Sequence, residues 1–250
     1  MLGFASIRKG KHACLNRSTQ PTQDWIALFL SENTTNIPTY LDWNCLVIIL
    51  GIKPTRIDNL KGEADLSKII YSMLVSLDGF VEGPDHNIDW GIIDEELHQY
   101  FNDQQAQIDT ALYGRRMYEI MSDFWPTADA DPTNPGYIIE FSRLWKKTPK
   151  VVFSKTLEKV EWNSRLVKED FAGEIRRLKA QPGKTMEIGG ANLAATFIKQ
   201  DLIDEYQLYV QPVILGSGVP FFPALDGKLN LRLVETHRFG NGVVLLRYLR

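Results

Sequence analysis

Cysteine is scarce in this chain, and histidine is not much more common. The only two cysteines, Cys14 and Cys45, lie in the first quarter of the sequence. A disulfide framework is therefore not expected, and a reducing compartment such as the cytoplasm is. The four histidines are not spaced as metal ligands, and the H-x-E and P-C-x-x-C signatures of zinc deaminases are missing. No metal site is predicted.

A surplus of positive charge and a long apolar run are missing as well. The formal net charge is −3 at pH 7 and the sequence pI is about 5.9, so nucleic acid is not an expected partner. The apolar run 45–52 is too short to span a bilayer, and residues 1–10 lack the apolar block of a secretory signal. We expect no membrane partner.

The sequence divides into two parts of different character. Residues 1–66 alternate polar stretches with isolated tryptophans and show no sustained periodicity, which indicates an N-terminal appendage with little regular order. Residues 67–250 carry the regular pattern of a single domain. Two interpretations of the appendage stay open: a small regulatory or oligomer-forming extension, or sequence outside the natural coding region, since Met73 lies close to the start of the domain.

Strand and helix patterns alternate along the second part. Strands are expected at 69–75, 110–113, 150–153, 165–168, 185–188 and 206–210, and helices at 94–107, 115–121, 136–147, 174–180 and 191–200. A loop with three prolines is expected at 123–135. The Gly240-Asn-Gly242 turn predicts a closing hairpin of strands 229–238 and 243–249. This order predicts an α/β fold with a mixed, mainly parallel sheet flanked by helices.

Gly189 and Gly190 join a short strand directly to a helix. Glycines let the backbone turn sharply and approach a ligand closely, and the free N–H groups of the first helical turn favour an anion. A phosphate or pyrophosphate would fit there. A plain strand-to-helix turn is the alternative, because the longer G-x-G-x-x-G fingerprint is missing; that absence also disfavours a Rossmann dehydrogenase.

Three segments together resemble a known family. The run GGANLAATFIKQDLIDEYQLYVQPVILGSGVPFF from Gly189 is similar to the C-terminal half of the dihydrofolate-reductase-like reductases related to the riboflavin biosynthesis reductase domain. The segments SLDGFV from Ser76 and LYGRRMYE from Leu112 agree in order and spacing. The resemblance covers roughly residues 67–250 and implies a dihydrofolate-reductase-like fold, NADPH as cofactor, and a homodimer in which the apolar segment 213–222 could take part.

Three loops at strand ends are the predicted cofactor site, because a ligand lies across the carboxyl ends of parallel strands. Gly114, Arg115 and Arg116 offer a helix N-terminus and two guanidiniums for the 2′-phosphate that separates NADPH from NADH. Solvated first-turn arginines are the alternative. The other two loops are Ser154, Lys155 and Thr156, with a capped turn as the alternative, and Gly189 and Gly190 with Asn192, assigned to the pyrophosphate and nicotinamide.

The substrate side is less well specified. Asp78 is the candidate for substrate contact and proton supply, because it lies on the turn after the first strand; a turn residue that bonds its own backbone is the alternative. Trp90 as a pocket wall and Gln211 as an amide at a strand end are further candidates, each with packing as the alternative. Glu82 is a further acidic candidate, ranked below Asp78.

Two departures from the family pattern bear on the substrate. Riboflavin-pathway reductases that resemble this chain carry an acid immediately before Gly-Gly, whereas here that position is Ile188 and the acid is Glu187, turned to the other face of the strand. The Asp-Ser pair of those enzymes is also replaced, by Ser154-Lys155. The chain is more similar to stand-alone bacterial relatives, and the missing zinc signature excludes a bifunctional deaminase-reductase.

The sequence therefore predicts an NADPH-dependent reductase of a small heterocyclic or ribosylamino substrate. The nearest family activity is the reduction of 5-amino-6-(5-phosphoribosylamino)uracil in riboflavin biosynthesis. A dihydrofolate or pterin reductase is the alternative enzyme, and a non-catalytic nucleotide-binding domain of the same fold is the alternative outside catalysis.

Overall fold

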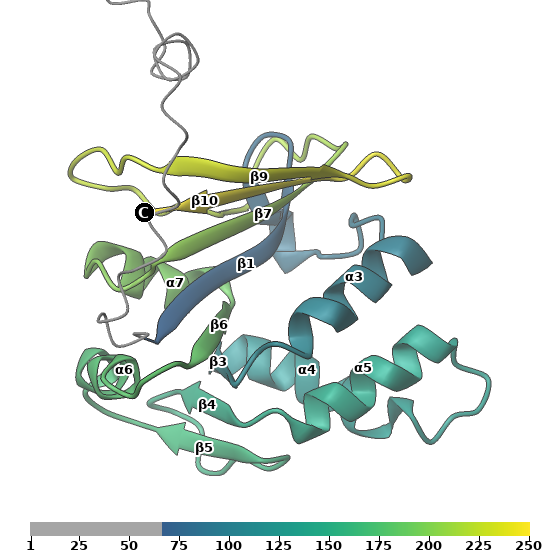
Figure 1. The fold of residues 1–250 in the computed structure, drawn as a ribbon, viewed down its shortest axis with the longest axis horizontal. Coiled ribbons are helices and arrows are strands. Elements are labelled where there is room, and N and C mark those ends of the chain that lie inside the picture. Colours follow the sequence, from purple (N-terminus) through teal and green to yellow (C-terminus); the bar gives the residue numbers. More distant parts are fainter. Residues whose placement is uncertain (1–66) are drawn as a thin grey trace, which may run out of the picture. The chain divides into compact units, whose positions relative to one another are not determined.

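The computed structural model describes residues 67–250, so the predicted appendage at 1–66 lies outside the described residues. An eight-stranded sheet forms the centre, in the order β5-β4-β3-β6-β1-β7-β10-β9 (Figure 1). Its strands are β1 (Lys68–Ser76), β3 (Thr110–Gly114), β4 (Lys150–Phe153), β5 (Ser164–Val167), β6 (Thr185–Gly189), β7 (Glu205–Gln211), β9 (Arg232–Arg238) and β10 (Val244–Leu249).

The strand directions match the predicted fold class. All neighbouring pairs from β5 to β7 are parallel, whereas β10 runs antiparallel to β7 and to β9. The sheet is thus mixed, mainly parallel, and closed by the β9–β10 hairpin. A second, two-stranded sheet pairs β2 (Phe80–Glu82) with β8 (Val219–Pro220).

Helices cover both faces of the sheet (Figure 1). Helices α6 (Phe171–Lys179) and α7 (Ala191–Lys199) pack on one face, where strand residues such as Tyr71, Leu112 and Ile188 are fully buried. Helices α3 (Glu95–Gln105), α4 (Arg115–Ala128) and α5 (Gly136–Lys147) lie on the other, and a short 3₁₀ turn, η1 (Pro84–His86), precedes them. Successive side chains of a strand point to opposite faces of the sheet. Leu112 therefore packs in the hydrophobic core on the α6 and α7 face, whereas its neighbour Tyr113 packs with α4 and α5.

The prediction of a loop at 123–135 is wrong for its first half. Helix α4 continues to Ala128 and includes Pro126 in its last turn. A proline there removes a single N–H donor. The packing of Trp125 on Phe141 of α5, with ring centroids 4.3 Å apart, stabilises the turn in compensation.

The segment predicted for a dimer interface is partly used within the domain itself. Val219 and Pro220 form β8, and the Phe221 side chain is 1% exposed and stacks on Tyr71. Ile214 is 70% exposed. The homodimer stays a prediction.

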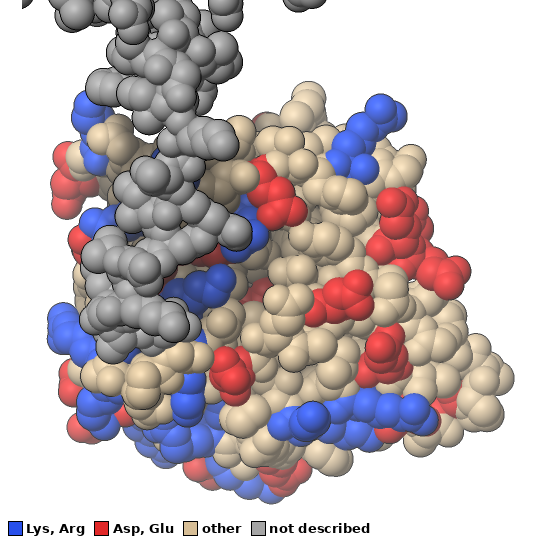
Figure 2. Space-filling model, viewed as in Figure 1, with Lys and Arg blue, Asp and Glu red and all other residues tan. Residues whose placement is uncertain are grey.

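The surface of the domain mixes charges of both signs, as the net charge leads one to expect, on the face that Figure 2 shows. Within residues 67–250, no helix is long and apolar enough to cross a membrane.

Candidate functional site

Two helix N-termini open onto one cleft at the carboxyl ends of the parallel strands. Helix α4 begins at Arg115 directly after β3, with Gly114 as its N-cap, and α7 begins at Ala191 after β6, with Gly190 as its N-cap. Neither N-cap offers a side-chain bond to the first turn, so backbone N–H groups at both ends are left for a ligand. Two positive helix ends facing one space favour an anionic ligand.

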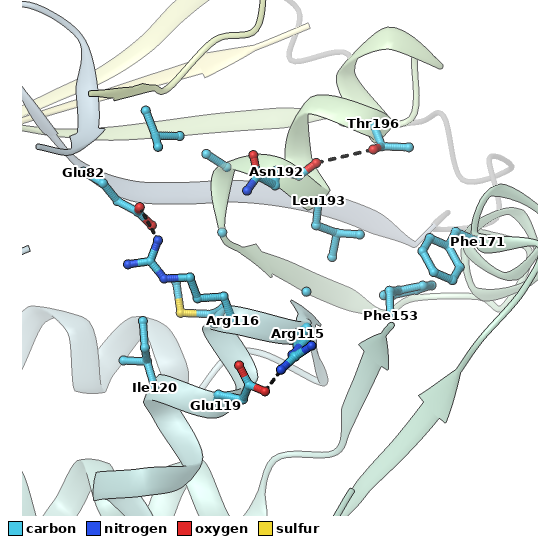
Figure 3. A pocket seen from close by; sticks show the side chains of 15 residues that line it. Glu82, Arg115, Arg116, Glu119, Ile120, Phe153, Phe171, Asn192, Leu193 and Thr196 are labelled. Carbon is cyan, nitrogen blue, oxygen red and sulfur yellow. Dashed lines mark hydrogen bonds and ion pairs between the residues drawn. The ribbon is translucent and has the colours of Figure 1, made fainter. Parts of the chain in front are cut away.

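The cleft has a volume of about 480 Å³, within the usual range of small-molecule sites. Figure 3 shows the Glu82–Arg116 pair at one end and the rings of Phe153 and Phe171 at the other. These two rings lie 5.3 Å apart, edge to face. The remaining lining comes from α4, α7, their N-caps and β8: Gly114, Arg115, Met117, Glu119, Ile120, Gly190, Ala191, Asn192, Leu193, Thr196 and Val219. The space suits an elongated ligand.

Gly189 and Gly190 both disfavour a side chain, Gly190 by its backbone conformation and Gly189 by close neighbours. Gly190 has a φ of +103°, which L side chains rarely adopt. A Cβ on Gly189 would lie 3.0 Å from Cε1 of Tyr113 and 3.1 Å from Cγ of Met117. The backbone itself therefore forms this wall of the cleft, and the residues present fit a dinucleotide whose pyrophosphate approaches the α7 N-terminus.

Both arginines at the start of α4 already hold acidic partners. Arg116 donates from Nη1 to Oε2 of Glu82 at 2.6 Å and from Nη2 to the backbone oxygen of His86 at 3.1 Å. Arg115 donates from Nε to Oε1 of Glu119 at 2.7 Å and from Nη1 to the hydroxyl of Thr156 at 3.0 Å. Both guanidiniums are 40% exposed or more, so such pairs exchange readily for a phosphate.

The predicted cofactor residues are brought together to different degrees. Gly114, Arg115, Arg116, Gly190 and Asn192 line the same cleft, and Gly189 adjoins it. The loop 154–156 lies beside the cleft without lining it. The buried Ser154 hydroxyl accepts from the backbone N–H of Thr156 and Leu157, which is the capped turn named as its alternative, while Thr156 supports Arg115 and Lys155 is exposed.

Asp78 lies outside the lining of the cleft and holds two loops together. Its carboxylate accepts from the Ser76 hydroxyl at 2.6 Å and from the backbone N–H groups of Leu215 and Gly216 at 3.1 and 2.7 Å. These bonds, that of Ser76 foremost, lower the pKa of Asp78. A carboxyl group that is ionised at neutral pH does not supply a proton, so this geometry favours the structural alternative.

Trp90, on the loop before α3, and Gln211, the last residue of β7, also lie outside the cleft lining. The Trp90 indole donates to the backbone oxygen of Asn87 at 3.1 Å. The buried Gln211 side chain accepts from the backbone N–H of Ile92 at 2.9 Å, and its Nε2 has no partner among the described residues. Gln211 thus anchors the loop that carries Trp90, and a substrate role for either residue stays a prediction.

Several cleft residues were missed from the sequence. Glu119 and Ile120 lie one helical turn after the two arginines, and Thr196 lies one turn after Asn192. The spacing of four residues on a helix that starts at a predicted ligand loop was an available signal. Phe171 had no such signal, because it reaches the cleft only through the packing of α6.

Several known proteins are similar to this chain. The RibD C-terminal domain family matches residues 67–245. The Bacillus subtilis (strain 168) proteins YyaP and YwjB are 36% and 32% identical over 185 residues, which covers 72% of this chain and 94% of YyaP, and 71% of this chain and 95% of YwjB.

Solved structures share the fold. A putative riboflavin biosynthesis protein from Shewanella sp. PV-4 superposes with a TM-score of 0.56 at 23% identity, covering 74% of this chain and 98% of that one. A diaminohydroxyphosphoribosylaminopyrimidine deaminase/5-amino-6-(5-phosphoribosylamino)uracil reductase from Thermotoga maritima gives 0.52 at 15% identity, covering 74% and 56%. The predicted dihydrofolate-reductase-like fold is confirmed.

Proposed function

Because the chain belongs to the RibD C-terminal domain family, we propose that it is an NADPH-dependent reductase of a small heterocyclic or ribosylamino substrate. The observation that carries the proposal is the convergence of two helix N-termini, two arginines and a side-chain-free glycine wall on one cleft. NADPH, when bound, supplies the hydride, so the protein has to orient the reacting atoms, exclude water and deliver a proton.

Different groups in the cleft suit different parts of the cofactor. Arg115 and Arg116 would hold the 2′-phosphate, where planar guanidiniums make paired, charge-assisted bonds. The N-terminus of α7, with Gly190 and Asn192, would take the pyrophosphate. Exchange of Glu82 and Glu119 for phosphate oxygens would release both guanidiniums from their present partners.

The nearest substrate is 5-amino-6-(5-phosphoribosylamino)uracil, on which the named activity of the Thermotoga maritima relative acts. Its reduction, followed as NADPH oxidation by the purified protein, tests the proposal, with dihydrofolate as the comparison substrate. Oxidation with the uracil and not with dihydrofolate is the expected result. NADPH oxidation with dihydrofolate alone would identify the protein as a dihydrofolate or pterin reductase instead. A protein that binds NADPH and oxidises it with neither, nor with related ribosylamino compounds, would be a nucleotide-binding domain without this chemistry.

A further inference from the structure

One carboxylate oxygen at the end of the cofactor cleft is shared by two side chains from different elements. Oε2 of Glu82 on β2 accepts from Nη1 of Arg116 on α4 at 2.6 Å and contacts Nδ1 of His86 on η1 at 2.7 Å. Because an ionised carboxylate can only accept, the imidazole donates from Nδ1 in this pair. Arg116 and His86 therefore depend on a single acceptor, and a change at one of them alters the bond of the other.

The turn that carries His86 has an unusual backbone. Asp85 and His86 have φ values of 56° and 63°, in the left-handed region, where residues other than glycine are uncommon. Such a conformation persists where neighbouring groups fix it. Glu82 bonds the ring of His86, and Nη2 of Arg116 donates to its backbone oxygen at 3.1 Å. His86, Glu82 and Arg116 thus form one closed unit.

Two members of this unit reach the cofactor cleft and the third does not. Glu82 and Arg116 line the cleft, at the end that Figure 3 shows, whereas His86 lies outside the lining. The side chain of His86 is 60% exposed, so its ring exchanges protons with solvent. His86 therefore acts on the cleft through Glu82 and not by contact with a ligand.

The departure of Arg116 would leave Glu82 short of partners. Its side chain is 19% exposed, and a mostly buried carboxylate is destabilised when its cation is removed. Among the described residues, the cationic groups that contact Glu82 are those of Arg116 and His86.

The other titratable groups around this unit carry no positive charge. Burial first, and then the charge of Glu82, raise the pKa of Tyr71 on β1, so this phenol stays neutral. Asp85, beside His86 on η1, is exposed and has no ion pair among the described residues. Strand β8, which pairs with β2, has no charged residue. A positive charge for Glu82 without Arg116 must therefore come from His86.

Histidine can provide this charge near neutral pH. An imidazole in an ordinary environment changes its charge between pH 5 and 8, and a neighbouring carboxylate favours the charged form, whereas a neighbouring guanidinium disfavours it. When Arg116 turns from Glu82 to a phosphate, the repelling charge moves away and the attracting charge remains. His86 should then bind a proton at Nε2 and hold Glu82 by a charge-assisted bond from Nδ1.

We propose that His86 is a positioning residue for Arg116: as a cation, it takes over the Glu82 carboxylate and leaves the arginine free for a phosphate of the cofactor. This inference rests on the proposed function. The proton moves from water to Nε2 of His86, and no other covalent bond changes. Binding of NADPH is then coupled to proton uptake, so NADPH should bind more tightly as pH falls.

Proton uptake on binding tests the inference without any substrate. Calorimetric titrations with NADPH at pH 7, in buffers of different ionisation enthalpy, measure the number of protons bound. His86→Asn is the matched variant, because asparagine tolerates the left-handed backbone and keeps a neutral N–H donor near the position of Nδ1. We expect the wild type to take up a fraction of a proton more than this variant, at most about one. The 2′-phosphate contributes equally in both proteins.

The affinities should separate in the same sense. The Kd for NADPH should be nearly equal in the wild type and His86→Asn at pH 8, and about three- to tenfold lower in the wild type at pH 6. His237→Asn, which removes an exposed histidine of β9, is the control and should behave as the wild type. Glu82→Gln removes the charge through which His86 acts, so the additional proton uptake should be lost there as well.

The outcomes separate the inference from the proposed function. Equal proton uptake by the wild type and His86→Asn, or an excess that persists in Glu82→Gln, would overturn the inference and leave the proposed function standing. A folded His86→Asn that binds no NADPH would show that His86 holds the cofactor itself, against a positioning role. Should His86→Asn fail to fold, the comparison of the wild type with Glu82→Gln decides. A wild type that binds no NADPH would overturn the proposed function, and the inference with it.

Discussion

Arg116 donates from Nη1 to Oε2 of Glu82 across 2.6 Å, and this ion pair lies at one end of the cleft (Figure 3). The guanidinium that the sequence assigned to a phosphate is thus held by a carboxylate. The two side chains are 40% and 19% exposed. A pair of this kind contributes about 0–1 kcal/mol, so a doubly charged phosphate can displace the carboxylate.

Removal of the Glu82 charge should tighten NADPH binding. In Glu82→Gln the competing carboxylate is lost and Arg116 is released, so we expect the Kd for NADPH to fall about three- to tenfold at low salt. Calorimetry measures the change, and Glu158→Gln serves as the equal-charge control. Weaker binding by Glu82→Gln would indicate instead that Glu82 itself holds part of the cofactor.

Gly190 should tolerate no side chain, whereas Gly136 should tolerate one. An alanine at a φ of +103° is strained, so Gly190→Ala should lower the free energy of unfolding by about 1–3 kcal/mol and weaken NADPH binding tenfold or more. Gly136 begins α5, and a Cβ there meets no atom within 4 Å, so Gly136→Ala should cost nothing. Urea denaturation and calorimetry compare the two. Equal behaviour would contradict the account of the glycine wall.

Asp78→Asn should destabilise the fold in a pH-dependent way. The pKa of Asp78 is lowered in the folded state, so its contribution is present above the unfolded pKa of about 4 and is lost as pH falls through the folded value. The melting temperature of the variant should lie below that of the wild type at pH 7, and the difference should shrink below about pH 4. A variant as stable as the wild type that fails to bind substrate would restore Asp78 as a substrate contact.

Glu187→Gln should change the pH dependence of stability in the opposite sense. The pKa of Glu187 rises from 4.5 to about 7, so the folded state retains a proton that the unfolded chain has lost. The wild type should therefore lose stability as pH rises from about 4.5 to about 7, by up to about 3 kcal/mol, and stay level above that. The variant should lack this loss. If the free energy of unfolding depended on pH in the same way in both proteins across this range, the pKa of Glu187 would not be raised.

Local patterns in the sequence were enough for most of the fold. Predicted strands 185–188 and 206–210 correspond to β6 and β7, and the predicted helix 191–200 to α7, because apolar alternation and the glycine pair are local signals. The end of α4 was not predictable in this way. Its last turn depends on Trp125 packing on Phe141, a contact between two helices that no single window contains.

The residues of the candidate site also differ in whether local sequence patterns predict them. Gly114, Arg115, Arg116 and Gly190 follow predicted strands directly, so topology alone gathers them at one sheet edge. The partners Glu82 and Glu119 were not predicted, because Glu82 reaches Arg116 through the β2–β8 pairing. Glu187 was noted as an acid on the other face of its strand.

Selective binding of NADPH is the most direct test of the central claim. The purified protein would be titrated with NADPH and NADH by calorimetry, beside an Arg115→Ala, Arg116→Ala double variant. An Arg143→Ala, Arg176→Ala variant, which removes two exposed arginines outside the cleft lining, is the control. Charge-assisted bonds of about 1.5–3 kcal/mol predict NADPH binding at least about tenfold tighter than NADH, with the preference lost only in the first variant. Binding of neither nucleotide, or a preference that survives the loss of Arg115 and Arg116, would contradict the account.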